Sequence, residues 1–375
     1  MNLSKISVPA SSPVHALPTN TINTGDLISI SNEEYDLVCS YMVKMVHSSP
    51  WDIRRIAGGV SSNVWLVRDA DDSYVVKQPL SRLRVQTSWH APLERSTYEY
   101  RWLRMAAQCD PRLVPPIVSF EPDRPLLVTR YLPPTAYPIW QRSLFDGNAN
   151  AIQAGSVGRA LVALHAHTAG KAHSQASFKA DQVLLATRIE PYFFATALRH
   201  PPVASTLRAI GESVLIQGRA VIHGDVSPKN ILLGPAVPVF LDAECACYAD
   251  PAFDLAFCLT HLLLKQVAVT ERRAALHRDA QALVHGYSAG VAWESAAALL
   301  ARCAVLLPAL MLARIDGKVP VSYLAEKQRE AVRAFALKHL DAATNDLEHV
   351  MQGLSELAAS MTHHRAKGDA FDYAN

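Results

Sequence analysis

The sequence predicts an α+β fold of two lobes, with a β-rich front part and a mainly helical back part. Short apolar runs typical of strands occupy much of residues 53–132. Helical periodicity dominates from about residue 150 onward. Strand-like runs return only in a compact island at 220–245, between polar loops. A chain of 375 residues is long enough to build two such lobes.

The order of these segments sets the expected boundaries. Residues 1–30 are rich in Ser, Pro, Thr and Asn and lack a continuous apolar stretch, so we expect a flexible leader without a secretory signal. The front lobe is expected at 31–132 and the back lobe at 133–360. The charged residues 361–375 are expected to form a loose tail.

The front lobe is expected to combine helices with short strands. An amphipathic pattern predicts the first helix, and a polar turn separates two β-type runs. A proline pair ends the last strand, because proline cannot donate to a sheet. In chain order the elements are helix Asn32–Lys44, strands Val64–Val67 and Tyr74–Lys77, helix Leu93–Ala107 and strand Leu126–Leu132.

The back lobe is expected to be helical around its island. The island has three β-type runs, Ala220–Ile222, Ile231–Leu233 and Val239–Leu241. Helical patterns then resume at Phe253. The apolar run Ala296–Ala313 is about as long as a membrane span. Because an arginine and a proline interrupt it, the run predicts a buried helix of the helical lobe.

Composition narrows the class of partner. The formal charge of +2 is close to neutral, so neither a nucleic-acid nor a membrane-surface partner is expected. The six cysteines are scattered, mostly in apolar segments, as expected of reduced thiols in a cytoplasmic protein. Cys245 and Cys247 form a C-x-C pair, but no second pair stands at zinc-finger spacing.

One polar segment of the island carries the strongest functional signal. It reads His223-Gly-Asp225-Val-Ser-Pro-Lys-Asn230, and Asp242 follows the next β-type run. A carboxylate at the head of such a loop could orient an acceptor hydroxyl and take its proton. Asn230 and Asp242 could supply the hard oxygen ligands that Mg²⁺ prefers. Because apolar runs flank the segment on both sides, a decorative surface turn does not explain it.

This motif resembles that of the aminoglycoside phosphotransferase and choline kinase superfamily, as does the stretch YADPAFDLAF at 248–257. The resemblance implies a bilobal protein-kinase-like fold, with ATP and Mg²⁺ as cofactors and a small-molecule hydroxyl as acceptor. It implies Asp225 as catalytic base and Asn230 and Asp242 as metal ligands. It also implies structural roles for His223 and Asp254.

The front lobe offers a matching set of candidate ATP-binding residues. A glycine-containing turn, whose candidate residues are Gly58, Gly59, Ser61, Ser62 and Asn63, could fold over phosphates. Lys77 ends a strand, where its ammonium could reach the α- and β-phosphates. Glu99 on the next helix could orient Lys77, with Glu94 as a competing partner. The end of the last strand, Thr129–Leu132, with Thr129, Arg130 and Tyr131 as candidate residues, is expected to be a hinge that binds adenine through its backbone.

A second resemblance concerns the acceptor. The phrase VVKQPLSRLR, Trp89 and the segment DAECACY at 242–248 resemble the 5-methylthioribose kinases. This makes Glu244 a further candidate metal-site residue and Trp89 and Arg314 candidate substrate residues. The chain departs from those kinases at Asn230 and in having a single arginine at 314. The expected acceptor is therefore a sugar or alcohol, methylthioribose-like, whose identity stays open.

Other functions compete with this hypothesis. An aminoglycoside is polycationic, whereas residues 270–375 contain twelve acidic and twelve basic residues, which favours a neutral acceptor. A catalytically silent kinase-fold module and a protein kinase also remain, although no Asp-Phe-Gly segment follows the loop. The pattern G-x-S-x-G at 286–290 indicates a helix C-cap rather than a hydrolase elbow, since a helical pattern precedes it. His165, His167 and His173 are expected at a helix end or in solvent.

Overall fold

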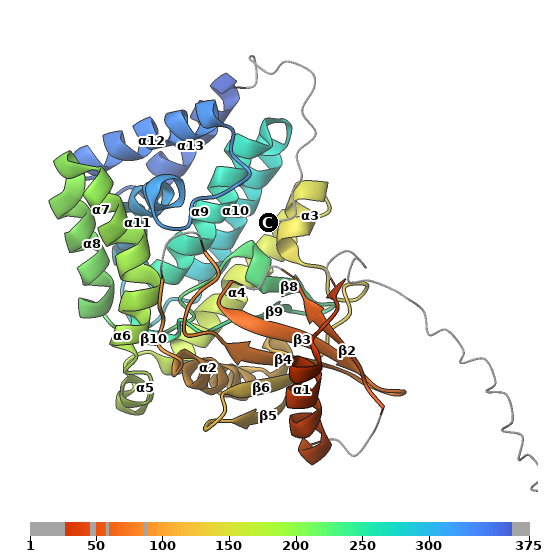
Figure 1. Ribbon diagram of the computed structural model, residues 1–375. Coiled ribbons are helices and arrows are strands. Elements are labelled where there is room, and N and C mark those ends of the chain that lie inside the picture. The colour runs from red at the N-terminus through yellow and green to blue at the C-terminus, as the bar shows by residue number, and fades with distance from the viewer. Residues whose placement is uncertain (1–26, 46–49, 58–59, 86–88, 362–375) are drawn as a thin grey trace, which may run out of the picture.

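The computed structural model describes residues 27–45, 50–57, 60–85 and 89–361. Its strands gather at one end of the molecule and most of its helices at the other, as Figure 1 shows. This is the mixed α+β arrangement that the sequence predicts, with a sheet in the front part and helices behind it.

The front sheet is antiparallel, with strand order β1-β2-β3-β4-β6-β5. Its edge strand β1 pairs Leu27 with Ile56, so the sheet takes in residues that the sequence assigns to the leader. In β4 the buried Tyr74 and Val76 alternate with less buried residues, whereas β3 buries the three consecutive residues 65–67. The strands are β1 (Leu27–Ile28), β2 (Asp52–Ile56), β3 (Ser62–Arg68), β4 (Ser73–Pro79), β5 (Ile117–Glu121) and β6 (Leu126–Arg130).

Two helices belong to this front part. Helix α1 (Asn32–Met45) buries Val38, Tyr41 and Met42 in a small core with residues of β3, β4 and β6. Helix α2 (Arg95–Cys109) contacts the sheet on one side and the helical part on the other. Both helices lie where the sequence predicts them, and α2 links the two halves of the molecule.

The back part is built from helices around a buried apolar core. Three short helical turns, η2 (Pro111–Leu113), η4 (Pro201–Val203) and η6 (Thr270–Arg272), join longer elements. The helices are α3 (Trp140–Asp146), α4 (Ala151–Thr168), α5 (Ala172–Ser177), α6 (Asp181–Leu184), the π-helical segment η3 (Leu185–Phe194), α7 (Ala195–Arg199), α8 (Ala204–Ile216), α9 (Ala252–Ala268), α10 (Arg273–Ser288), α11 (Ala296–Asp316), α12 (Glu326–Asp341) and α13 (Leu347–Met361).

The island predicted at 220–245 consists of two small antiparallel sheets. Strand β7 (Ala220–Ile222) pairs with β10 (Cys247–Ala249), and β8 (Ile231–Leu233) pairs with β9 (Pro238–Phe240). The short turn η5 (Pro228–Asn230) leads directly into β8. In Figure 1 these strands lie between the front sheet and the helices, which places their loops at the junction of the two parts.

Helices α4 and α10 approach each other closely because glycines line their contact. A Cβ atom at Gly158 would lie 2.3 Å from the carbonyl oxygen of Leu283, and one at Gly286 would lie 2.3 Å from that of Gly155. Gly286 therefore stands inside α10, and the predicted helix C-cap at this residue is wrong. Close backbone packing, which only glycine allows, is the physical reason for its place in the sequence.

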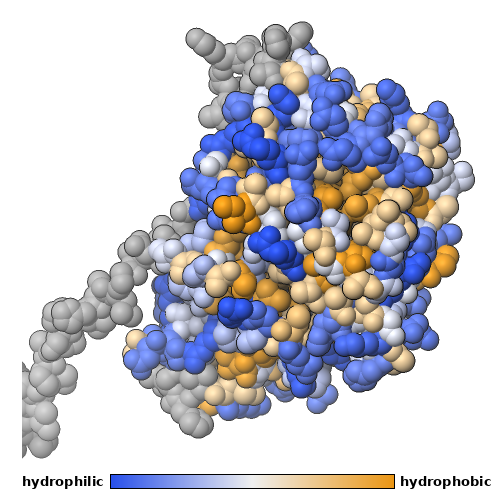
Figure 2. Space-filling model, turned by 180° about the vertical axis from the view of Figure 1, so that it is seen from behind, coloured by the Kyte–Doolittle hydropathy of each residue, from blue (hydrophilic) through white to orange (hydrophobic). Residues whose placement is uncertain are grey.

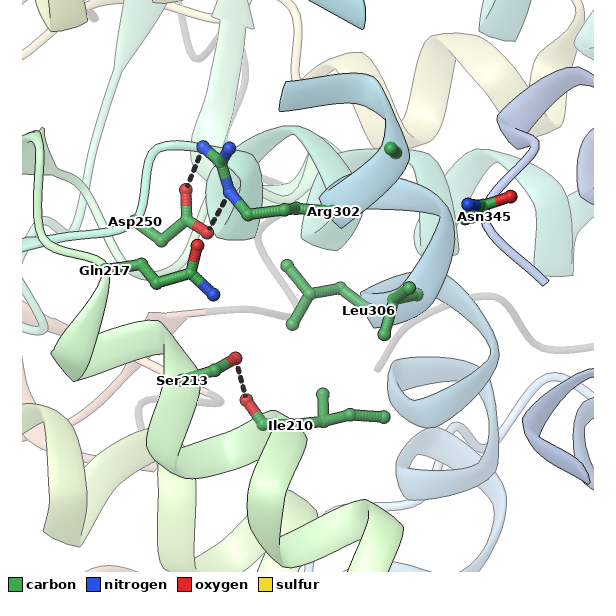
Figure 3. A pocket seen from close by; sticks show the side chains of 9 residues that line it. Ile210, Ser213, Gln217, Asp250, Arg302, Leu306 and Asn345 are labelled. Atoms are coloured by element: carbon green, nitrogen blue, oxygen red, sulfur yellow. Dashed lines mark hydrogen bonds and ion pairs between the residues drawn. The ribbon is translucent and has the colours of Figure 1, made fainter. Parts of the chain in front are cut away.

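Helix α11 is the one helix in the described ranges that is long and apolar enough to cross a membrane by length and composition. In its most apolar window 61% of the residues are buried inside the protein. Its Arg302 forms ion pairs with Asp250 at 2.7 Å and Glu294 at 2.8 Å. Figure 3 shows this arginine beside a surface pocket of about 250 Å³ whose lining includes none of the predicted site residues. The helix is packed as a core element, as predicted.

The surface is mixed in polarity. Figure 2 shows apolar side chains near the middle of one face, with polar side chains above and below them. The most exposed large apolar side chains of the described residues, Ile152, Leu198 and Ile216, belong to three different helices, α4, α7 and α8. Single exposed apolar residues are ordinary in proteins, so we assign no function to them.

Candidate active site

The predicted catalytic loop lies between β7 and β8 and turns sharply at Gly224. This glycine has φ of +77°, a conformation that residues with a Cβ rarely adopt. A Cβ atom there would lie 2.5 Å from the carbonyl oxygen of Cys245. The tight turn therefore explains why glycine stands between His223 and Asp225.

Asp254, in the first turn of α9, fixes the backbone of this loop through hydrogen bonds. Its carboxylate accepts hydrogen bonds from the backbone N–H groups of His223, at 2.7 Å, and Gly224, at 2.9 Å. It also accepts from His165 Nε2 at 3.2 Å, while the other ring nitrogen of His165 accepts from the hydroxyl of Tyr287 at 2.7 Å. His165 lies in the last turn of α4, at a helix end as predicted, but it is buried and supports the loop, so the alternative of a solvent-exposed ring is wrong.

His223 ties the loop to the next one. Its Nε2 donates to the carbonyl oxygen of Leu241 at 3.0 Å, and its Nδ1 accepts from the backbone N–H of Asp225 at 3.1 Å. Burial lowers the pKa of His223, which outweighs the nearby carboxylates of Asp254 and Asp225. The neutral ring thus holds the segment before Asp242 against the loop that carries Asp225.

Asp225 is buried and surrounded by donors. Its Oδ2 accepts from Asn230 Nδ2 at 2.9 Å and pairs with a guanidinium nitrogen of Arg188 at 2.9 Å. Lys229 stands 4.0 Å from the same oxygen. These contacts all go to Oδ2, which leaves Oδ1 as the oxygen that could meet an acceptor hydroxyl. Because Asn230 uses its amide nitrogen here, its Oδ1 is the atom that could bind a cation.

Arg188 was not identified by the sequence reasoning. It belongs to the π-helical segment η3, donates to the carbonyl oxygen of Gly224 at 2.6 Å and lies 5.6 Å from the ring centre of Tyr192. Burial opposes its charge, but the neighbouring carboxylate of Asp225 raises its pKa. No sequence pattern indicated Arg188. Its side chain reaches Asp225 from a π-helical segment, and such segments have no simple sequence signature.

Lys77 lies at the centre of three carboxylates that come from both parts of the molecule. It donates to both oxygens of Glu99 at 2.9 Å, is ion-paired with Asp242, and stands 3.9 Å from Glu244. Glu94, the competing partner considered from the sequence, forms no ion pair with Lys77 in the described part of the chain. We call Glu99, Asp242 and Glu244 the carboxylate cluster. Through its contacts with Lys77 of β4, the carboxylate cluster links the front part, including Glu99 of α2, to the loop after β9.

Electrostatics in this cluster balance burial against charge pairing. Burial alone would lower the pKa of Lys77, but the carboxylates of Asp242 and Glu99 raise it well above its usual range. Burial raises the pKa of Glu99 to about 7, although the ammonium of Lys77 acts in the opposite direction. Burial would also raise the pKa of Asp242, but Lys77 lowers it below its usual range.

The carboxylate cluster has the chemistry of a divalent-cation site. One oxygen from each of its residues lies within 4.8 Å of the others. Asp242 adopts φ of +66°, an uncommon backbone conformation for a residue with a side chain. Glu244 also pairs with Arg95 at 3.1 Å, so this buried arginine competes with a metal ion for it. The donor set fits Mg²⁺, although Lys77 already pairs with Asp242, and the Oδ1 of Asn230 could add a further oxygen ligand.

The predicted phosphate-binding turn is described only in part, because Gly58 and Gly59 lie outside the described residues. The carbonyl oxygen of Ser61 accepts from Arg95 at 2.6 Å, and Asn63 Nδ2 donates to Gln78 at 3.4 Å. Ser62 is buried at the start of β3, and its hydroxyl has no partner among the described residues. This end of β3 is thus tied to α2 through Arg95.

In the expected hinge, two backbone N–H groups are already used. That of Arg130 donates to Pro116 at 2.8 Å and that of Tyr131 donates to Ser73 at 2.9 Å. Thr129 is buried in β6. An adenine ring would therefore need other backbone groups of this segment. The side chain of Arg130 points to Asp72 and the ring of Tyr74 instead.

The two candidate substrate residues make contacts near η3. The indole N–H of the buried Trp89 donates to the carbonyl oxygen of Ala186 at 2.9 Å. Arg314, in the last turn of α11, donates to the hydroxyl of Tyr192 at 3.3 Å and to the carbonyl oxygen of Val319. Trp89 thus anchors the front loop to the back part, and Arg314 shares Tyr192 with Arg188.

The geometry brings one base, amide and carboxylate oxygens and an ammonium group together from two halves of the chain. A family model described as the phosphotransferase enzyme family matches residues 52–299. The chain belongs to this family. The resemblance recognised from the HGD motif is thereby confirmed.

Individual curated relatives share only low sequence identity with this chain. Methylthioribose kinases of Bacillus thuringiensis (strain Al Hakam) and Bacillus mycoides (strain KBAB4) are each 24% identical over 249 residues, covering 58% of this chain and 62% of theirs. The chain therefore spans less than two thirds of the length of these curated relatives.

Solved structures of the same fold include two other kinases. An amicoumacin kinase in complex with AMP-PNP and Ca²⁺ matches with a TM-score of 0.54 at 13% identity, covering 84% of this phosphotransferase and 98% of that chain. A choline kinase from Cryptosporidium parvum Iowa II matches with a TM-score of 0.50 at 8% identity, covering 88% and 96%. The predicted kinase-like fold is confirmed.

Proposed function

We propose that this phosphotransferase moves the γ-phosphate of ATP to a hydroxyl of a small molecule. The observation that carries the proposal is the contact of Lys77 with Glu99 and Asp242, one from each part of the molecule. A lysine held this way can release a carboxylate and meet the phosphates of ATP. Family membership and the loop that holds Asp225 support the same chemistry.

Asp225 would act on the acceptor. Its Oδ1 would accept a hydrogen bond from the hydroxyl and take its proton as the oxygen attacks the γ-phosphorus. The acceptor O–H bond breaks as its proton passes to Asp225, and the acceptor oxygen forms a new bond to the γ-phosphorus. The bond between the γ-phosphorus and the bridging oxygen of ADP breaks, and its electron pair leaves on ADP. Arg188 and Asn230 hold Oδ2 of Asp225, so the base is fixed before the acceptor arrives.

The nucleotide would lie between the front sheet and the loops of the island. Asn230 and Asp242 would hold Mg²⁺, with Glu244 as a further ligand if it leaves Arg95. The bound ion would supply charge compensation for the phosphates. Lys77 would bind phosphate oxygens, and Glu99 would keep its ammonium in position.

The acceptor proposed from the sequence is a sugar or alcohol of the methylthioribose type, supported by similarity to methylthioribose kinases. Arg188 lies beside the catalytic carboxylate, and Arg314 shares Tyr192 with it. Positive charge at this place disfavours the polycationic aminoglycosides.

Substituting Asp225 tests the proposal. We expect Asp225→Asn, which keeps the shape of the side chain, to lower turnover by about a thousandfold or more while Mg-ATP affinity stays within about threefold. Asp341→Asn, at the exposed end of α12, is the matched control and should retain full activity. ADP release with a panel of sugars and alcohols measures turnover, and calorimetry measures affinity. Near-normal turnover of Asp225→Asn would overturn the assignment, and a wild type that releases no ADP with any acceptor would favour the silent module.

A further inference from the structure

One face of helix α9 leads away from the catalytic loop and carries polar residues that the mechanism does not use. Asp254, Phe257, His261 and Lys265 follow one another at helical spacing along this face. Asp254 braces the loop, whereas His261 and Lys265 lie deeper in the back part. Both are buried, Lys265 completely.

Lys265 has no ionic or hydrogen-bonding partner among the described residues. Its ammonium lies 5.1 Å from the ring centre of Phe145 and 5.0 Å from that of Tyr323. Aromatic faces stabilise a cation only in part, and burial lowers the pKa of Lys265 to about 7, with the charge of Arg314 acting in the same direction. An amine in such surroundings is costly for the folded protein unless it has a use.

Its neighbours are also incompletely paired. Nδ1 of His261, Nε of Arg314 and the hydroxyl of Tyr323 are buried and have no hydrogen-bond partner in the part of the chain that the structure describes. Within the same part, none of His261, Lys265 and Arg314 is ion-paired with a carboxylate. Several donors without an acceptor in one buried place are unusual.

This group is continuous with the catalytic site. Arg188, which pairs with Asp225, lies 5.7 Å from the ring centre of Phe257, and that ring lies 5.3 Å from the ring of His261. Arg314 and Arg188 lie over the ring of Tyr192, at 5.8 and 5.6 Å. We call Arg188, His261, Lys265 and Arg314 the basic cluster. It extends from the catalytic carboxylate to Tyr323, which is only partly buried.

We propose that the basic cluster binds an anionic group of the acceptor, so that the substrate is an alcohol carrying a carboxylate or a phosphate. This inference rests on the proposed phosphoryl transfer from ATP to a hydroxyl. It departs from the neutral, methylthioribose-like acceptor expected from the sequence, because it gives the acceptor an anionic group. The hydroxyl would meet Asp225, and the anionic end would accept hydrogen bonds from Arg314, Lys265 and His261. A neutral acceptor would leave Nζ of Lys265, Nδ1 of His261 and Nε of Arg314 without a charged partner, and the basic cluster would repel a cationic acceptor.

Matched pairs of acceptors test the inference. Gluconate against glucose and ribose 5-phosphate against ribose differ in an anionic group, a carboxylate in the first pair and a phosphate in the second. With saturating Mg-ATP, ADP release should show kcat/KM about tenfold or more higher for the anionic member of at least one pair. The pair that shows the preference identifies the anion. Equal values in both pairs, or preference for the neutral sugars, methylthioribose or choline, would overturn the inference.

A variant of Lys265 separates binding from a structural role. Lys265→Met keeps an unbranched side chain of similar length without the charge. We expect its KM for the anionic acceptor to rise about tenfold, with kcat and the KM for the neutral member little changed. Lys338→Met, on the exposed side of α12, is the control and should match the wild type. Equal effects on both members of a pair would mean that Lys265 only supports the fold, and would contradict the inference.

Failure of this inference can be told from failure of the proposed function. Absence of Mg-ATP binding in calorimetry contradicts the proposed function, whereas Mg-ATP binding with preference for neutral acceptors contradicts the inference alone. If no acceptor turns over, titration of inorganic phosphate in the presence of Mg-ADP decides. Binding that weakens about tenfold in Lys265→Met supports the basic cluster, and absent or unchanged binding overturns it.

Discussion

Two lysines near the loop that carries Asp225 lie in opposite surroundings, Lys77 partly buried and Lys265 completely buried. Lys77 lies in the carboxylate cluster, within 3.9 Å of all three acidic residues. Lys265 lies among aromatic rings and other basic side chains, without an acidic partner in the described chain. The pKa of Lys77 is raised, and burial lowers that of Lys265 to about 7.

The difference shows how one side chain type serves different ends. Around Lys77 the protein itself supplies negative charge. The carboxylates that now pair with Lys77 could instead bind a metal ion, while Lys77 binds the nucleotide phosphates. Around Lys265 the protein supplies further basic side chains, and no carboxylate of the described residues neutralises their charge. Asp225 stands between these regions and is paired with Arg188, a member of the basic cluster. The carboxylate cluster thus suits a metal-bound nucleotide, and the basic cluster suits an anion.

The largest expected effect concerns the carboxylate cluster. Asp242→Ala removes the carboxylate that faces Lys77 and the proposed metal ion, so the affinity for ATP in the presence of Mg²⁺ should fall by about a hundredfold. Calorimetry with and without EDTA measures the magnesium-dependent part. Without Mg²⁺ the variant and the wild type should bind ATP about equally. Unchanged affinity with Mg²⁺ would show that Asp242 is no metal ligand.

A large loss of stability is expected at Arg95, which supports the same cluster. Its buried guanidinium bonds Glu244 and the carbonyl oxygens of Ser61, Leu80 and Pro92, at 2.6 to 3.1 Å. Arg95→Met would leave a buried carboxylate and these carbonyls without their donor, which costs about 3–5 kcal/mol of the free energy of unfolding. Urea unfolding measures it. Arg101→Met, on the exposed side of the same helix, is the control and should change little.

For Lys265 the comparison predicts a pH dependence. Its pKa of about 7 in the folded protein lies below the usual 10.5, so between these values the unfolded chain binds more protons. The stability contributed by the neutral amine is therefore present above about pH 10.5 and is lost as the pH falls toward about 7. Over this window the wild type should gain about 1.4 kcal/mol per pH unit relative to Lys265→Met.

Urea unfolding of both proteins between about pH 7 and about pH 9 measures this slope. Lys77 provides the contrast, because its pKa is raised and its charge persists throughout the window. Stability curves of the wild type and Lys265→Met that run parallel would show that Lys265 keeps its proton in the folded protein. The two lysines would then not differ as described.

The smallest effect is expected outside both clusters. Arg130 pairs with Asp72 on the front sheet, where both side chains are more than 40% exposed. Exposed ion pairs contribute little, because solvent screens them. Arg130→Met should therefore leave the urea midpoint almost unchanged, and ATP affinity should also persist if the hinge binds adenine through backbone groups. A large loss of ATP affinity would instead assign the side chain to nucleotide binding.

The positions of the motif residues on neighbouring loops were predictable because they depend on local spacing. Asp225, Asn230 and Asp242 stand on loops bounded by short strands, and such loops meet at one edge of an island. Glycine at 224 fits a local turn with positive φ. Arg188, His165 and Lys265 were missed because nothing in their neighbourhood marks them. Their surroundings are formed by residues more than thirty positions away in the sequence, as when Arg188 donates to the carbonyl oxygen of Gly224.

The sequence by itself determined the family, the α+β division and the acidic loop residues, since these follow from periodicity, composition and a short motif. Only the tertiary structure decided which charges meet. It paired Lys77 with Glu99 rather than Glu94, placed Arg188 on Asp225 and left Lys265 without an acid among the described residues. Electrostatic energy depends on distance through space and on burial. Neither quantity is a function of separation along the chain.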